Sequence, residues 1–150
     1  MVYLLFQIGA DRYALEASGT VAVEPCVRLK HIPGAAAGVA GVFDYHGTPV
    51  PVVDLSAMAL GRPARASLST RLVIVRYGGE QLLGLLAEKA VDTARYRDAD
   101  FHDPGVTGAP YLGPVATDAR GGIVQRVELE RLLTPEVRAV LWRQAREVLA

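Results

Sequence analysis

The sequence has little of what secretion, membrane insertion or disulfide chemistry requires. It contains a single cysteine, Cys26, so no internal disulfide can form, and a lone thiol is typical of a protein kept in a reducing compartment. The apolar opening over residues 2–8 has no basic lead and is far shorter than the roughly 20 residues that cross a bilayer. We therefore expect a cytoplasmic protein without direct membrane insertion.

The sequence also has no excess of positive or negative charge. Sixteen Lys and Arg residues balance sixteen Asp and Glu residues, and no run of either sign occurs. Nucleic-acid-binding proteins normally carry a basic stripe, so that class is disfavoured. With 150 residues, 51% of them hydrophobic, the chain fits one domain over residues 1–150, or two small lobes that share a core.

The motifs of common enzymes are absent. There is no Gly-rich phosphate loop, no G-x-S-x-G and no H-E-x-x-H. The three histidines fall on different expected elements, so neither a metal nor another cofactor is predicted. Asp54 precedes a short apolar run, where a helix N-cap is expected rather than a general base. A small enzyme using His46, Asp54 or Cys26 is the weakest alternative, and we predict no catalytic residues.

Alternation of apolar and polar residues predicts strands along most of the chain. Gly78 and Gly79 separate two apolar runs and predict a two-residue hairpin loop. The expected strands cover residues 2–8, 13–16, 20–23, 26–32, 72–77, 80–86, 91–96, 111–117 and 122–127. Many short strands joined by Gly and Pro turns indicate an all-β fold of small barrels.

Two short helices are expected to close the chain. For the last helix, Thr134 is the predicted N-cap and Pro135 the first helical residue. One face of it carries an apolar stripe made of Val137, Val140, Leu141, Ala145, Val148 and Leu149. We expect this stripe to pack on the chain's own barrel; a groove on a partner is the alternative.

Residues 41–61, GVFDYHGTPVPVVDLSAMALG, are the most informative segment. They predict a strand, a tight glycine turn, a second strand and a short helix that ends at Gly61. Pro49 and Pro51 lack a backbone donor and therefore place the second strand at a sheet edge or a bulge. An edge strand with Val50 and Val52 on alternate positions is a natural docking surface for a protein. The segment indicates a partner rather than a substrate.

This segment resembles the signature of the CheW-like chemotaxis coupling proteins, in which a G-V-x-N-x-R-G turn leads into V-x-P-V-x-D-L. The matching residues here are Gly41, Val42, Asp44, His46, Gly47, Val50, Pro51, Val52, Asp54 and Leu55. Further similarity covers nearly the whole chain, at Phe6, Gly9, Tyr13, Ala14 and Leu15, at 84–88, at 111–113, at Leu132 and Leu133, and in the tail helix.

The resemblance implies two five-stranded SH3-like barrels packed around a common core, with short helices and a capping helix. It also implies a non-enzymatic adaptor that couples the cytoplasmic tip of a chemoreceptor to the regulatory domain of a CheA-type histidine kinase. Such an adaptor is found at membrane-associated receptor complexes. The groove near the turn is expected to face the receptor, and another barrel edge to meet the kinase through apolar contacts.

Two departures mark the chain as a divergent member. Asp44 and His46 replace the family's asparagine and arginine, and a histidine cannot reproduce the bidentate fork of arginine. Ala22 stands where the family has the glutamate that pairs with this arginine, and Glu24 is out of phase. A place in a pathway resembling the Wsp-type chemosensory systems is a further expectation.

From these patterns we predict a set of partner-binding residues and a set of structural ones. Alternation gives a strand two faces, so some of the apolar candidates are expected to belong to the core. The partner-binding candidates are Val42, Asp44, Tyr45, His46, Gly47, Val50, Pro51, Leu72 and Leu86, and the structural ones are Gly41, Asp54 and Gly84. A β-barrel interaction module of another signalling complex is the main alternative function.

Overall fold

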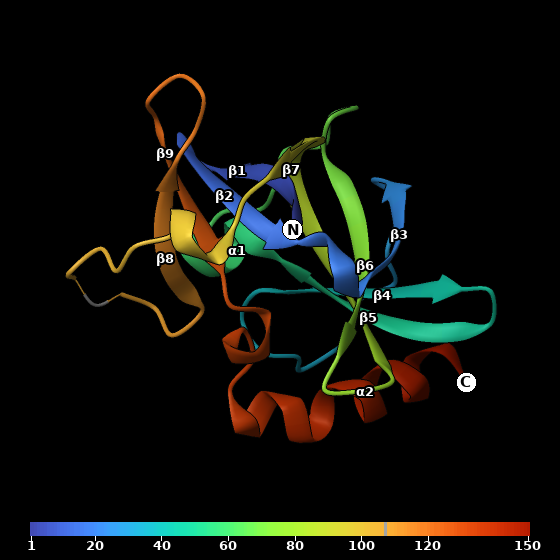
Figure 1. Ribbon diagram of the computed structural model, residues 1–150. Helices are drawn as coiled ribbons and strands as arrows, with labels where there is room; N and C mark the ends of the chain where they lie inside the picture. The colour runs from blue at the N-terminus through green and yellow to red at the C-terminus, as the bar shows by residue number, and fades with distance from the viewer. Residues whose placement is uncertain (107) are drawn as a thin grey trace.

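The computed structural model describes residues 1–106 and 108–150. Strands dominate these residues, and two α-helices and three single 3-10 turns complete them (Figure 1). In chain order the elements are β1 (Val2–Ile8), β2 (Asp11–Glu16), η1 (Ala17–Gly19), β3 (Thr20–Pro25), β4 (Val39–Tyr45), β5 (Thr48–Asp54), α1 (Leu55–Leu60), β6 (Arg71–Tyr77), β7 (Gln81–Arg95), η2 (Asp98–Asp100), β8 (Leu112–Thr117), β9 (Ile123–Val127), η3 (Leu129–Arg131) and α2 (Pro135–Leu149).

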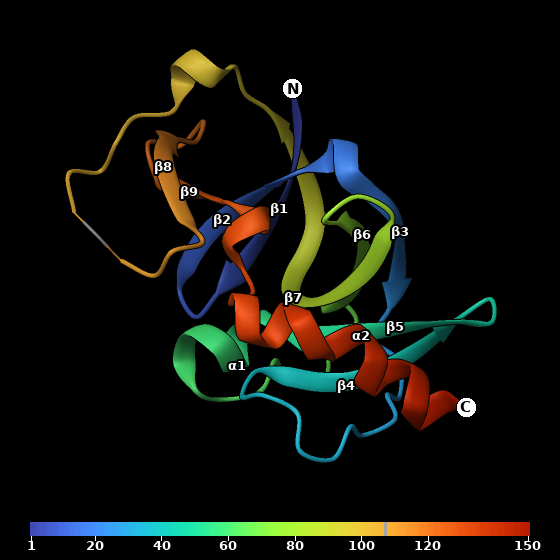
Figure 2. The same cartoon turned by 90° about the horizontal axis from the view of Figure 1, so that it is seen from below.

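The long strand β7 belongs to two sheets at once. Its first half pairs with β5 and β6, and its second half pairs with β1. The first sheet therefore contains β3, β4, β5, β6 and β7, and the second contains β1, β2, β7, β8 and β9. Figure 2 shows β7 passing between the two groups of strands. A bulge lies at the junction, where the register with β1 shifts between Leu5 and Gln7 and Lys89 takes a φ of 52°.

Each sheet rolls up into a small barrel, and one isolated pair of residues bridges the opening that remains in each barrel. In the first barrel Lys30 and Val42 exchange backbone hydrogen bonds of 3.0 and 2.8 Å. In the second barrel His102 and Val115 do the same at 2.7 and 2.8 Å. The predicted pair of five-stranded SH3-like barrels with short helices is confirmed, although no continuous strand pairing closes either opening.

Local signals explain the hairpin after β6 and the two helix starts. Gly78 and Gly79 both adopt positive φ, at 61° and 104°, which glycine tolerates. The predicted hairpin is present, but its loop has three residues instead of two, because Tyr77 pairs with Gln81 and Glu80 joins the two glycines. Asp54 accepts a hydrogen bond from the backbone N–H of Ala57 and caps α1. Thr134 caps α2 in the same way, as the sequence predicts.

One buried cluster contains residues from both barrels and from α2. It includes Phe6 and Leu15 of the second barrel and Val73 and Leu85 of the first. Trp142 of α2 is buried in it and donates its indole N–H to the carbonyl of Leu82 at 2.8 Å. In Figure 1 the helix runs beneath β4 and β5. The expected packing of the tail helix on the chain's own barrel is confirmed.

Two further expectations about secondary structure were wrong. Residues 26–32 form no strand and pair with β4 only at Lys30. The alternation of inward Val27 and Leu29 with outward Arg28 reflects one buried face of an extended segment that passes the opening of the first barrel. This pattern does not require pairing with a neighbouring strand. The end of the chain contains a single 3-10 turn and one helix of 15 residues instead of two short helices.

None of the helices described is long and apolar enough to cross a membrane.

Candidate functional site: an apolar seam beside the hairpin of β4 and β5

A tight turn joins β4 to β5 and projects from the first barrel (Figure 1). His46 and Gly47 occupy its two central positions with φ values of 51° and 88°, as expected for a type I′ hairpin turn. The carboxylate of Asp44 accepts a hydrogen bond of 2.7 Å from the backbone N–H of Gly47. Asp44 and Gly47 therefore fix the turn, and the His46 side chain remains exposed.

An aromatic row lies next to this turn. Phe43 and Tyr45 share one face of β4 because strand side chains alternate, and their ring centroids are 6.4 Å apart. The imidazole of His46 continues the row, 4.5 Å from the ring of Tyr45. Both Phe43 and Tyr45 are half-buried. Each ring therefore contacts the barrel on one side and leaves the other side available.

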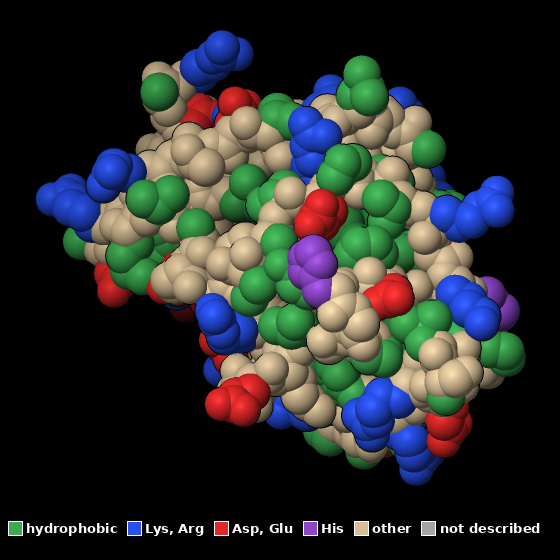
Figure 3. Space-filling model, turned by 90° about the vertical axis from the view of Figure 1, so that its right-hand side faces the viewer, with side chains coloured by type: hydrophobic (Ala, Val, Ile, Leu, Met, Phe, Trp, Pro, Cys, Tyr) green, Lys and Arg blue, Asp and Glu red, His purple; other side chains and the backbone are tan. Residues whose placement is uncertain are grey.

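The aromatic row belongs to a larger surface, which we call the apolar seam. Its members are half-buried hydrophobic side chains that pack on one buried cluster of the first barrel: Val21, Ala22, Val27, Leu29, Phe43 and Tyr45. The buried floor of the seam consists of Val50, Val52, Leu72, Ile74 and Leu86. Figure 3 looks onto the side of the molecule from which the hairpin projects, and hydrophobic side chains gather there. Apolar and aromatic side chains are typical of the core of protein interfaces, which a polar rim surrounds.

Several predicted contact residues lie in the interior instead. Val50 and Leu72 are 0% exposed, Val42 is 2% exposed and Leu86 is 8% exposed. Pro51 is buried as well. The physical reason is that a strand of a small closed barrel buries the side chains pointing inward, and α2 covers the opposite face of β4 at Val42. These residues do not form surface contacts.

Four predicted residues do lie at the surface. Asp44, His46 and Gly47 are exposed, and Tyr45 is half-buried above the seam floor. The structure brings these four together in the turn. The members of the seam that the sequence analysis missed are those from β3 and the following segment, because nothing in the sequence says that they lie beside β4. Phe43 could have been found from its i, i+2 relation to Tyr45.

The two prolines of β5 lie where that strand has only one neighbour. Pro49 is opposite Asp44 and Pro51 is opposite Val42, whereas pairing with β7 begins at Val52. The expected edge position is therefore correct for this half of β5. Because proline has no N–H, the edge offers no donor at either position, which disfavours the addition of a partner strand. The seam offers side chains to a partner, and this edge does not offer a backbone ladder.

The predicted structural residues have clear packing roles. A Cβ on Gly41 would lie 2.5 Å from the carbonyl oxygen of Lys30, so glycine permits the backbone pairing of Lys30 with Val42 that bridges the opening of the first barrel. A Cβ on Gly84 would lie 2.9 Å from side-chain atoms of both Leu72 and Val52. Asp54 is 5% exposed and its second carboxylate oxygen accepts from the N–H of Ala64 at 2.8 Å.

The residues considered for catalysis do not meet. His46 lies in the turn that precedes β5, and Asp54 is the last residue of that strand, so the whole extended length of β5 separates them. Cys26 is exposed after the end of β3. A recess of about 600 Å³ between β1, the β7 bulge and the turn of β8 and β9 is lined by none of the three. Among the described residues no cluster of His, Cys, Asp or Glu could hold a metal ion.

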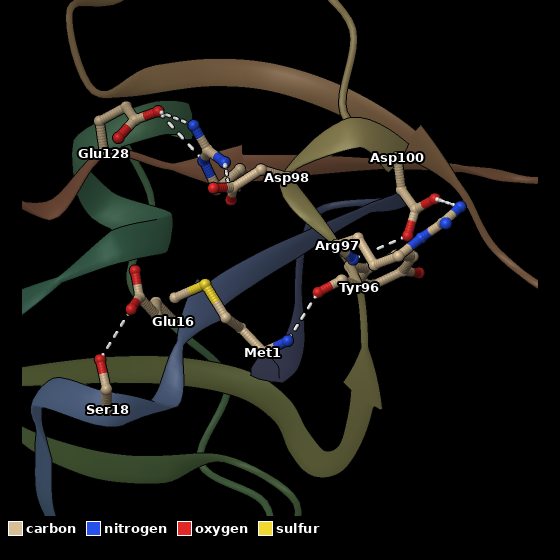
Figure 4. Close-up of polar contacts among 9 residues, drawn as sticks. Met1, Glu16, Ser18, Tyr96, Arg97, Asp98, Asp100 and Glu128 are labelled. Atoms are coloured by element: carbon tan, nitrogen blue, oxygen red, sulfur yellow. Dashed lines mark hydrogen bonds and ion pairs between the residues drawn. The ribbon is translucent and has the colours of Figure 1, made fainter.

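A network of charged groups holds the second barrel together around the start of β1 (Figure 4). Arg126 donates to Glu128 through two nitrogens, at 3.2 and 3.0 Å, and lies 3.9 Å from Asp98. Burial alone would lower the pKa of Arg126, but the interactions with Glu128 and Tyr3 together outweigh burial, and the pKa is raised. The ammonium group of Met1 donates to the carbonyl of Tyr96 at 2.8 Å. These contacts tie β1 and β9 to the segment after β7.

Two rolled sheets sharing one strand, with a half-buried apolar seam beside a projecting hairpin, define a β-barrel module suited to binding proteins. A model of the CheW-like domain matches residues 2–137, and the chain belongs to the CheW-like family. Its fold is similar to the crystal structure of the scaffolding protein TtCheW from Thermoanaerobacter tengcongensis, with a TM-score of 0.81 and 19% sequence identity over 91% of this chain and 89% of the other. No curated protein sequence matches the chain.

Proposed function

We propose that this protein is a non-enzymatic adaptor that couples the cytoplasmic tip of a chemoreceptor to the regulatory domain of a CheA-type histidine kinase. The observation that carries the proposal is the apolar seam beside the Asp44–Gly47 turn, in a chain of the CheW-like family. A surface of half-buried aromatic and aliphatic side chains suits recognition of a helical hairpin better than that of a small substrate.

The mechanism is thermodynamic linkage. An adaptor that holds receptor and kinase together transmits the receptor's state as a difference in affinity or geometry at the kinase. We propose that residues 1–150 act as one unit, since the main buried cluster contains side chains from both barrels. We assign the receptor to the seam of the first barrel. The kinase then meets another barrel edge, and the second barrel exposes Ile123 of β9 as an apolar contact there.

The decisive experiment is cross-linking and affinity purification of the tagged protein from its native cells, with mass spectrometry of the recovered partners. We expect a CheA-type kinase together with a methyl-accepting receptor, from the cytoplasm at membrane-associated receptor complexes. The identity of these partners also tests the prediction of a Wsp-type pathway. Recovery of a different signalling complex by the folded protein favours the alternative of another interaction module.

A variant of the seam gives this experiment a matched control. Tyr45→Glu places a charge among half-buried apolar side chains at the surface. We expect it to lose the receptor and retain the kinase. Ala139→Glu introduces the same side chain at an exposed position of α2, which belongs neither to the seam nor to the edge that exposes Ile123, and should recover both partners. Loss of both partners by the two variants alike would contradict the assignment of the receptor to the seam.

A further inference from the structure

Charge is segregated in this protein although its net charge is zero. Residues 25–43 and residues 55–79 contain no Asp or Glu, yet they carry Arg28, Lys30, Arg62, Arg65 and Arg71 as well as Arg76. The two segments lie apart in the sequence and neither forms a run of basic residues. Only the fold can show whether their charges add up to one surface.

The fold brings four of these cations together at one end of the first barrel. Arg71 pairs with Pro25, the last residue of β3, and the segment containing Arg28 and Lys30 follows directly. The carbonyl of Arg65 accepts a hydrogen bond of 2.6 Å from the hydroxyl of Thr70, which places Arg65 beside Arg71. Next to Arg65, Ala64 packs in the same cluster as Val27 and Leu29, the inward neighbours of Arg28 and Lys30. We call Arg28, Lys30, Arg65 and Arg71 the basic surface.

These four side chains have no carboxylate partner. Among the described residues none of them forms an ion pair within 4.0 Å, whereas Arg12, Arg97, Arg126 and Arg143 all do. Arg28, Lys30 and Arg65 are exposed, and Arg71 is half-exposed. In Figure 3 basic and histidine side chains lie along the upper right-hand margin, and an acidic side chain lies lower on that margin. The nearest acidic residues in the sequence are Glu24, Glu80 and the buried, hydrogen-bonded Asp54.

The basic surface is continuous with the apolar seam. Val27 and Leu29 belong to the seam and alternate with Arg28 and Lys30 along the same extended segment. On the other side, Leu68 lies between Arg65 and Arg71 in the sequence and is 92% exposed. Cations therefore border apolar side chains on two sides, as at the rim of a protein interface.

We propose that the basic surface recognises an acidic, partly apolar helical segment of a protein partner and steers it onto the seam. Three of the four cations are arginines, whose planar fork matches a carboxylate in bidentate fashion. Single-stranded nucleic acid is recognised by aromatic side chains along a positively charged groove, whereas here the aromatic residues Phe43 and Tyr45 belong to the neighbouring seam. Anionic lipid is recognised by cations beside a membrane-spanning or amphipathic helix, whereas these cations lie on loops and a strand end. The proposal rests on the proposed adaptor function and specifies the chemistry of the receptor-side partner.

The test compares two double variants with the same change of charge. Arg28→Glu with Arg65→Glu reverses the basic surface, and Arg120→Glu with Arg146→Glu reverses two exposed arginines on the turn after β8 and on α2. Each replacement changes the net charge by two, so each pair changes it by four. The probes are a helical peptide rich in Glu and Leu, the same peptide with Gln for Glu, phosphatidylcholine vesicles with and without phosphatidylserine, and a DNA duplex.

We expect the acidic peptide to bind the native protein and the control variant, and the Gln peptide to bind neither. At low salt the variant with Arg28→Glu and Arg65→Glu should associate with the acidic peptide at least about tenfold more slowly than the native protein does. The reason is that steering charges act mainly on the association rate. This difference should shrink as salt shortens the Debye length to a few ångströms. Equal binding by both variants, or binding to vesicles or DNA in place of the peptide, would overturn the proposal. The peptide result stands apart from the purification experiment, so either proposal can fail alone.

Discussion

The division between a buried floor and an accessible seam predicts opposite behaviour for two neighbouring residues. Leu72 is 0% exposed beneath the seam, and Tyr45 is half-buried above it. Replacing a buried leucine by alanine removes transfer free energy and leaves a cavity, and together these cost about 2–5 kcal/mol. A domain of this size has a total stability of roughly 5–15 kcal/mol. Leu72→Ala should therefore leave a folded protein with much of its stability gone.

The Tyr45→Ala variant should lose far less stability than Leu72→Ala, but it should lose affinity for the partner. Its ring is half-solvated and its aromatic neighbours each contribute about 0.5–1.5 kcal/mol, so we expect a loss of about 1–2 kcal/mol. An aromatic side chain at the centre of an interface commonly contributes at least about 2 kcal/mol to binding. The affinity for the receptor-side partner should therefore fall by about 30-fold, at about 1.4 kcal/mol for each factor of ten.

The chain contains its own probe for the stability measurement. Trp142 is the single tryptophan, it is buried, and its ring stacks on Tyr77 with centroids 5.7 Å apart. Urea unfolding followed by its fluorescence gives the free energy of each variant, and affinity is measured on the same samples. A Leu72→Ala variant of native stability that no longer binds would show that Leu72 is a contact residue, and the assignment of floor and seam would be wrong.

Three further predictions concern residues that stabilise the fold. Asp54→Ala removes the α1 cap and leaves the N–H of Ala64 without its acceptor, so it should destabilise the protein in urea by about 2–4 kcal/mol; a loss no larger than that of an ordinary exposed substitution would refute this. Lys89 holds a positive φ that glycine adopts freely, so Lys89→Gly should stabilise the protein by about 0.5–1 kcal/mol. Lys89→Ala should give no gain, and equal unfolding free energies for the two variants would contradict the reasoning. Hydrogen bonds from the backbone of Gly122 and Arg120 lower the pKa of Asp118; the stability it contributes is present above the ordinary carboxyl pKa and is lost as pH falls through the lowered one. The unfolding midpoints of the native protein and Asp118→Asn should therefore differ at pH 7 and converge as pH falls through the lowered pKa; a constant difference would contradict the shift.

The hairpin of β4 and β5 could be predicted because every signal for it is local. Gly47 supplies the turn, Pro49 excludes a central position, and Asp54 and Gly61 begin and end the helix. Its buried face could not be predicted. Residues 50–53 read V-P-V-V, and the structure buries all four, since one side faces the barrel interior and the other faces the main cluster and α2. Alternation identifies a strand that has one wet face, and this strand has none.

The basic surface was hidden from the sequence for a different reason. Arg28 and Arg65 are 37 positions apart in the printed sequence, and a net charge of zero with no run of one sign suggests an even distribution. The surface exists because β3 pairs with β6, so the segments that follow β3 and precede β6 share one end of the barrel. Secondary structure that is correct in every element still does not contain this information, since strand order is a long-range property.

The same separation of local and long-range causes explains how a histidine can stand at position 46. Asp44 and Gly47 hold the turn through a hydrogen bond and a positive φ, and histidine is among the residues that tolerate the left-handed region. No ion pair among the described residues includes His46, and Ala22 of the seam offers no charge. His46→Arg should therefore change the free energy of unfolding by less than about 0.5 kcal/mol, as is usual at exposed sites. Its effect should appear in binding alone, where a bidentate fork next to Tyr45 gains a contact with partner carboxylates. Measured urea stability and receptor affinity that fall together would show that the side chain at position 46 supports the turn itself.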